Sequence, residues 1–229
     1  MIDLLLPPRC LACAVVGAEP LCADCTDLLE PDGEGHRLAE GIVAIAAFAY
    51  ADPLAAAIKR VKTDALRRGG VALAGLLQPL LPVRTPRTWV PAPPGRRRHR
   101  GIDLPELLAG PAAIPLLRAT RRRPDQPDLT AADRRAAAIG AYAALGSVPP
   151  AVVVVDDVRA TGATLLAAAT ALREGGARRV LAVSVAASAG SPSAARQVVQ
   201  ATQAIQAALG PARAADRGPG SAAASGRWS

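Results

Sequence analysis

The sequence predicts an α/β protein with a mainly parallel, doubly wound sheet and a small N-terminal four-cysteine zinc ribbon. Residues 152–155 are four consecutive valines, and such a short β-branched run is typical of a strand buried on both faces of a parallel sheet. Strand-like and helix-like runs alternate over residues 42–187, which indicates helices on both faces of that sheet. The four cysteines all lie between residues 10 and 25, in two Cys-x2-Cys pairs.

The ribbon is expected over residues 1–30, followed by a polar connector at 31–40. Apolar runs bounded by proline, glycine and polar residues then predict the elements of the main domain, which spans residues 42–190. Its early strands are expected at residues 42–50, 89–93, 114–118 and 139–145. Its early helices are expected at residues 53–62, 66–81, 102–110 and 131–137, the first with a proline in its opening turn, where a missing N–H costs little.

The chain after the valine strand completes the domain. Residues 163–175 have a strongly helical composition, and Gly175-Gly176 suits the end of that helix. Residues 179–187 are the last expected strand. Residues 191–229 are expected to form a C-terminal helix and then a disordered tail, because a tail rich in Gly, Ala, Ser and Arg has too little apolar surface to bury.

The spacing of the cysteines predicts a metal site. They read Cys10-x2-Cys13-x8-Cys22-x2-Cys25, and four thiolates in two such pairs suit a tetrahedral zinc ion. A shell of four thiolates is coordinatively closed, so the zinc is expected to be structural. The alternative, a pair of disulfides, is disfavoured in a reducing compartment.

The N-terminal segment gives no sign of export. It has three leucines and an early acid, Asp3, in place of the basic start and long apolar run of a signal peptide. No uninterrupted apolar run reaches the roughly 20 residues of a membrane span. The expected location is cytoplasmic, without a membrane span.

The positive charge of the chain is concentrated in one segment. The net charge is +8, and residues 84–135 hold twelve arginines against five acids. Polyanions are therefore the expected partners, either phosphorylated small molecules or nucleic acid. Aromatic residues make up only 2% of the chain, too few for base-stacking platforms, so a phosphate-binding pocket is favoured while contact with a DNA backbone stays open.

Residues 156–164, DDVRATGAT, carry the strongest functional signal. Two carboxylates end the valine strand, and a turn of small residues leads into a helix. Ligands of parallel sheets bind at the carboxyl ends of strands, and backbone amides at a helix N-terminus bind phosphate. Ionised carboxylates accept hydrogen bonds from sugar hydroxyls. The motif predicts a ribose phosphate, with Asp156 and Asp157 on the hydroxyls and residues 160–164 on the 5′-phosphate.

Two other interpretations of the motif are weaker. Thr161 could serve as a simple helix cap on an ordinary strand–turn–helix. A Walker B strand needs an upstream loop that ends in Gly-Lys-Ser/Thr, and the chain contains no Gly-Lys pair. The chain also lacks a Gly-x-Gly-x-x-Gly dinucleotide fingerprint.

The motif closely resembles the phosphoribosyl-pyrophosphate (PRPP) signature of type I phosphoribosyltransferases, with Ala160 in place of the commoner threonine. The resemblance implies a type I phosphoribosyltransferase-like fold and Mg²⁺ bound together with PRPP. It makes Asp157 the candidate catalytic residue. The implied PRPP-binding residues of the motif are Asp156, Asp157, Ala160, Thr161, Gly162, Ala163 and Thr164.

Taken in order, the segments over about residues 4–187 resemble the ComF-type (competence protein F-like) family of phosphoribosyltransferase-fold proteins. Besides the cysteines and the motif, the matching residues are Tyr50, Ile58, Lys59, Lys62, Val90, Pro91, Pro93, Arg97, Arg100, Gly101, Gln126, Leu129, Asp133 and Arg134. The chain departs from the family at Thr63, at residues 102–104, at Asp133 and at residues 137–138.

The resemblance implies two functions. One is a phosphoribosyltransferase that releases diphosphate on transfer to an unknown acceptor, and the other is a non-catalytic PRPP- or nucleotide-binding module of DNA uptake or regulation. In the second case the ribbon would contact DNA or a partner protein.

Basic side chains are the expected ligands of the diphosphate. The turn that carries Arg97, Arg98 and Arg100 suits this role, because guanidinium forks match phosphate oxygens. Lys59 and Lys62 share one helix face and either approach the site or are surface charges.

Overall fold

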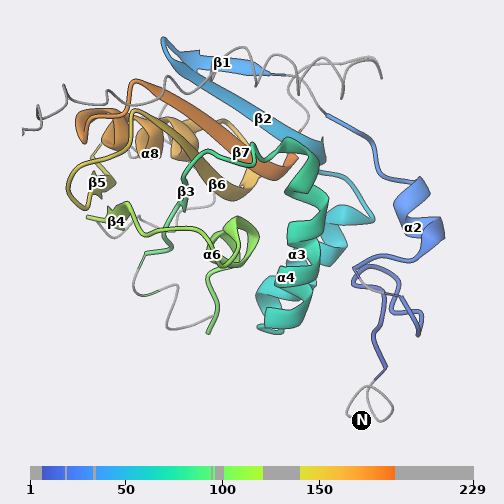
Figure 1. Ribbon diagram of the computed structural model, residues 1–229. Helices are drawn as coiled ribbons and strands as arrows, with labels where there is room; N and C mark the ends of the chain where they lie inside the picture. The colour runs from blue at the N-terminus through green and yellow to red at the C-terminus, as the bar shows by residue number, and fades with distance from the viewer. Residues whose placement is uncertain are drawn as a thin grey trace, which may run out of the picture.

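The computed structural model describes residues 7–18, 20–32, 35–93, 95, 101–120 and 140–188 (Figure 1). Three predictions fall outside these residues. They are the arginines of the 96–100 loop, the helix at 131–137 and the C-terminal helix and tail at 191–229.

The centre of the fold is a sheet in which the described residues form five strands, in the order β1-β2-β7-β6-β3. The strands are β1 (His36–Ala39), β2 (Ile42–Ala49), β3 (Arg87–Trp89), β6 (Ala151–Arg159) and β7 (Arg179–Ala187). The pairs β2·β7, β6·β7 and β3·β6 are parallel, and β1 pairs antiparallel with β2 at one edge. The prediction of an α/β fold with a mainly parallel sheet is confirmed.

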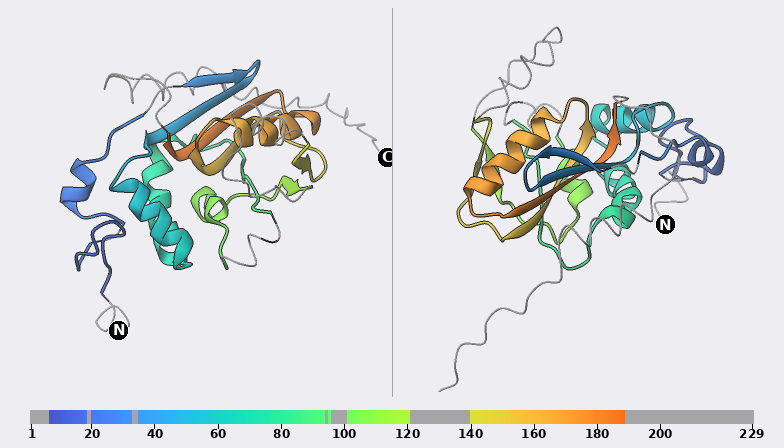
Figure 2. Two further views of the ribbon diagram at one scale, coloured as in Figure 1. Left: turned by 180° about the vertical axis from the view of Figure 1, so that it is seen from behind. Right: turned by 90° about the horizontal axis from the view of Figure 1, so that it is seen from above.

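Helices cover both faces of the sheet (Figure 2). The first face packs against α3 (Leu54–Thr63), α4 (Arg67–Ala74), the 3-10 helix η1 (Gly75–Leu80) and α6 (Leu104–Ala109). The second face packs against α8 (Ala163–Glu174) and a small antiparallel pair, β4 (Leu117–Ala119) and β5 (Tyr142–Ala144). This arrangement of layers requires strands that are apolar on both sides.

The valine run meets that requirement. Val153 and Val155 belong to the core on the first face, whereas Val152 and Val154 belong to the core on the second face. All four side chains are fully buried. An alternating apolar and polar pattern would have placed polar groups in one of the two cores, which explains why this strand is valine throughout.

The strand expected at 89–93 is found earlier in the chain, as β3 at Arg87–Trp89, and other elements differ from the sequence-based expectations as well. The valine strand does not end at the carboxylates but continues to Arg159, because β7 pairs with it as far as Ala187. The connector at 31–40 contains β1, a polar edge strand that only its pairing with β2 reveals. The helix expected at 66–81 is divided into α4 and η1, and Pro79 lies within η1.

The N-terminal ribbon packs against the main domain and contains the short helix α2 (Ala23–Asp27). Cys10, Leu11 and Cys25 are buried in the same core as α3 and α4. The approach is close, since a Cβ at Gly69 of α4 would lie 3.0 Å from Leu11 Cδ2. The ribbon is therefore part of the core that lies on one face of the sheet. Within the described part of the chain, none of the helices has the length and apolar character to cross a membrane.

Candidate functional site

A cavity of about 220 Å³ lies where β3 and β6 end. This is the end of a parallel sheet at which ligands bind. Its walls come from six parts of the chain, namely residues 156–158, residues 90–93, residues 102–105, Lys62, Tyr142 and Thr164. The structure thus brings both carboxyl groups of the motif and Thr164, in the first turn of α8, to one cavity.

Asp156 is buried at the cavity, with 8% of its surface exposed. Its Oδ1 accepts a hydrogen bond of 2.8 Å from the backbone N–H of Asp157. Burial, together with the neighbouring charge of Asp157, raises the pKa of Asp156 to about 8. The carboxyl group is therefore mainly protonated at neutral pH, whereas the sequence argument treats both aspartates as ionised acceptors.

Asp157 is paired with a lysine from the other side of the cavity. Lys62 Nζ lies 2.8 Å from Asp157 Oδ2, and both side chains are partly exposed. Lys62 stands near the end of α3 and lines the cavity, whereas Lys59 is exposed and does not line it. Of the two roles left open by the sequence, Lys62 approaches the site and Lys59 is a surface charge.

The turn before α8 has the shape of a helix N-terminus. Gly162 has φ = 75°, in the left-handed region, and its carbonyl accepts the N–H of Leu166 at 2.8 Å. The hydroxyl of Thr161 accepts a local hydrogen bond of 3.4 Å from Ala163 N–H. Thr164 lines the cavity, whereas Ala160, Thr161, Gly162 and Ala163 do not; Ala160 is exposed, and Gly162 and Ala163 are buried.

The opposite wall depends on a residue that the sequence reasoning did not single out as functional. Asp103 is buried, and its Oδ2 accepts the N–H of Ala92 at 3.0 Å. This bond ties the chain after β3 to the start of α6. The sequence indicated the position of Asp103 at a helix N-terminus, since Asp followed by Leu-Pro is typical of the start of a helix. Tyr142, which also lines the cavity, had no such signal beyond its expected strand.

The arginines expected to bind diphosphate, Arg97, Arg98 and Arg100, lie outside the described residues. The segments on either side of them are described. Residues 91–93 and residues 102–105, on either side of the arginines in sequence, both line the cavity.

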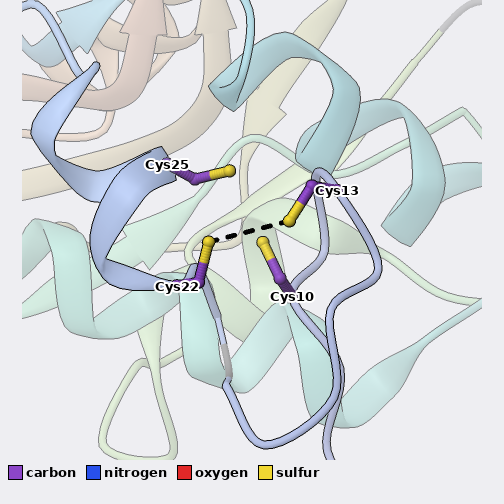
Figure 3. A group of neighbouring side chains, drawn as sticks. All are labelled: Cys10, Cys13, Cys22 and Cys25. Atoms are coloured by element: carbon purple, nitrogen blue, oxygen red, sulfur yellow. Dashed lines mark hydrogen bonds between the residues drawn. The ribbon is translucent and has the colours of Figure 1, made fainter.

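The four cysteines converge, as the sequence predicts (Figure 3). Their Sγ atoms all lie within 4.8 Å of one another, and Cys13 Sγ is 3.6 Å from Cys22 Sγ. Four sulfurs around a tetrahedral ion with bonds of about 2.3 Å stand roughly 3.8 Å apart, which matches this separation. All four thiols are free, so no disulfide occupies the site. The cluster is positioned to bind a metal ion.

The protonation of these thiols also fits a cation. Burial and the neighbouring thiols raise the pKa of Cys25 to about 12. Burial opposes ionisation of Cys10 as well. Hydrogen bonds from the backbone N–H groups of Ala12, Cys13 and Cys22 outweigh this effect and lower the pKa of Cys10 to about 6. Four crowded thiols cannot all ionise unless a positive charge offsets their repulsion.

No protein-family model matches this chain, and no curated protein is significantly similar to it.

Proposed function

We propose that this chain binds PRPP in the cavity at the end of β6 and transfers its phosphoribosyl group to an acceptor, with release of diphosphate. One observation supports the proposal most strongly. The cavity gathers Asp156, Asp157 and Thr164 of the first turn of α8, and this combination of carboxyl groups beside a helix N-terminus suits a ribose phosphate. The motif's resemblance to the PRPP signature, and the order of segments typical of the ComF-type family, support the same assignment.

Each part of PRPP has a partner in this proposal. Asp156 and Asp157 bind the ribose hydroxyls, and the amides at the start of α8 bind the 5′-phosphate. A protonated Asp156 suits this task, because a neutral carboxyl both donates to and accepts from a hydroxyl. Arg97, Arg98 and Arg100 bind the diphosphate, since the ends of their loop line the cavity.

The reaction requires positioning more than covalent chemistry. The bond from the anomeric carbon to diphosphate breaks, a bond to the acceptor forms, and the acceptor loses a proton. Asp157 lies at the cavity surface, where its charge favours the positive character that develops on the ribose ring. Mg²⁺ bound together with PRPP would neutralise part of the charge on the diphosphate, since this cation typically binds substrate phosphates.

We also propose that the cysteines hold one zinc ion with a structural role. The thiol geometry and the closed set of four ligands favour zinc. The burial of Cys10 and Cys25 in the shared core favours a structural function.

A binding module without catalysis is the second candidate. It is favoured by the scarcity of aromatic side chains that could stack on an acceptor base, since Tyr142 is the one aromatic residue among the described residues that line the cavity. Such a module would use PRPP or a nucleotide as a signal, in DNA uptake or regulation.

Diphosphate release distinguishes the two candidates. The full-length protein is incubated with PRPP, Mg²⁺ and a panel of nucleobases, and free diphosphate is measured. A transferase releases diphosphate with at least one acceptor. A binding module shows PRPP binding by calorimetry with no turnover on any member of the panel. Absence of both binding and turnover would refute the proposed function.

A further inference from the structure

The described lining of the cavity holds more carboxyl groups than cationic side chains. Three carboxyl groups line the cavity, those of Asp103, Asp156 and Asp157. Among the described lining residues, Lys62 is the one cationic side chain. PRPP carries several negative charges, so its entry beside the ionised Asp157 is opposed by repulsion, and the ammonium of Lys62 reduces this repulsion.

The position of Lys62 allows it to contact both Asp157 and a ligand. The side chain comes from the last turn of α3, across the cavity from β6, and remains 23% exposed. Its ammonium lies 2.8 Å from Asp157 Oδ2. An ammonium has three N–H donors, so a single bond to Asp157 does not exhaust it.

We propose that Lys62 recognises the diphosphate of PRPP while it stays bonded to Asp157. This inference rests on the proposed function and adds the residue that selects a diphosphate over a monophosphate. Lys62 would then connect the carboxylate that holds the ribose to the group that leaves it. A different role is conceivable in which the ion pair only fastens α3 to β6, and the two roles predict different ligand dependence.

The test uses one variant and a control from the same helix. Lys62→Met removes the ammonium, and Lys59→Met removes an equal charge from an exposed position that does not line the cavity. Each full-length protein is titrated with PRPP, ribose 5-phosphate and inorganic diphosphate. Circular dichroism checks the fold, and Lys62→Gln replaces the methionine variant should that one fail to fold.

We expect Lys62→Met to weaken the binding of PRPP and of inorganic diphosphate by about tenfold or more, as a lost charge-assisted hydrogen bond does. Ribose 5-phosphate, which lacks the diphosphate, should lose less than about threefold. Lys59→Met should leave all three affinities within about twofold, because a screened surface charge contributes little. Lys62→Arg should retain part of the diphosphate affinity.

The other outcomes separate this inference from the proposed function. If Lys62→Met weakens PRPP and ribose 5-phosphate equally, the ion pair only positions Asp157, and the inference is wrong although PRPP binding stands. If the wild type binds inorganic diphosphate through Lys62 but neither ribose compound, the proposed function fails and the anion-binding role of Lys62 survives. If the wild type binds none of the three, both are overturned.

Discussion

At the scale of single residues, Asp156 and Asp157 differ in a way that their adjacency in sequence conceals. Both line the cavity, but Asp156 is buried and holds its proton, whereas Asp157 is partly exposed and pairs with Lys62 at 2.8 Å. Successive side chains of a strand point to opposite faces, and the motif continues as strand. The two carboxyl groups therefore occupy different environments, one buried and one partly exposed beside a lysine.

The buried carboxyl predicts a pH-dependent stability. Because the pKa of Asp156 is raised from 3.8 to about 8, the folded protein keeps a proton that the unfolded chain has released between these values. Its contribution to stability is full below about pH 4 and is lost as the pH rises through about 8. In urea unfolding, wild-type stability should fall relative to Asp156→Asn over this window, by at most about 1.4 kcal/mol per pH unit. Parallel pH profiles for the two proteins would contradict the protonated state.

At the scale of elements, the end of α3 is a strained helix stop. Ala65 follows the helix with φ = 52°, in the left-handed region that favours glycine. The N–H of Leu66 reaches back to the carbonyl of Val61 at 3.2 Å, the bond of a Schellman motif. The helix that carries Lys62 therefore ends in the usual way but with an unusual residue.

Ala65→Gly should consequently stabilise the protein. Glycine relieves the left-handed strain, and after its greater freedom in the unfolded chain is subtracted, the gain in unfolding free energy should reach about 0.5–1 kcal/mol. The control Ala56→Gly lies inside the same helix and should lower stability by about 1 kcal/mol. Chemical denaturation of both variants checks the opposite signs. A loss of stability in Ala65→Gly would show that the strain is absent.

Which elements could be predicted from the sequence depends on where their signal lies. The strand at 179–187 and the helix from residue 163 were predicted because local apolar content and Gly175-Gly176 define them. β1 was missed because His36–Ala39 is polar and partly exposed, and its strand conformation comes from pairing with β2. The extension of β6 to Arg159 was missed for the same reason, since β7 imposes it.

At the scale of the whole molecule, the ribbon and the main domain share one core. Leu11 packs beside Gly69 of α4, and Arg60 of α3 donates a hydrogen bond of 3.3 Å to the carbonyl of Cys10. Loss of the metal should therefore affect more than the ribbon.

We expect one zinc ion per chain in protein purified without added zinc, measured by elemental analysis. Removal of zinc by a chelator should lower the Tm of the main unfolding transition by at least about 5 °C, because each kcal/mol corresponds to roughly 2–4 °C in a chain of this size. Added zinc should restore the Tm, which controls for irreversible damage. An unchanged main transition after complete zinc removal would show that the ribbon is energetically separate.

Only part of the candidate site could be predicted from the sequence. The aspartates, the turn and the cysteines were found because each set is contiguous or regularly spaced in sequence. The pairing of Lys62 with Asp157 and the bond of Asp103 to Ala92 join segments whose contact only the fold creates. The proton on Asp156 follows from burial, which no local pattern specifies.

The central claim, that Asp156 and Asp157 hold a ribose phosphate, is tested most directly by calorimetric titration of PRPP with Mg²⁺. The proteins are the wild type, the double variant Asp156→Asn/Asp157→Asn, and a control with the same type of substitution at two exposed aspartates of the ribbon, Asp24→Asn/Asp27→Asn. The wild type and the control should bind PRPP alike. The double variant, folded by circular dichroism, should bind at least about tenfold more weakly, because the hydrogen bond that a ribose hydroxyl donates to the ionised Asp157, worth about 1.5–3 kcal/mol, is impaired. Equal affinity in all three proteins would contradict the account.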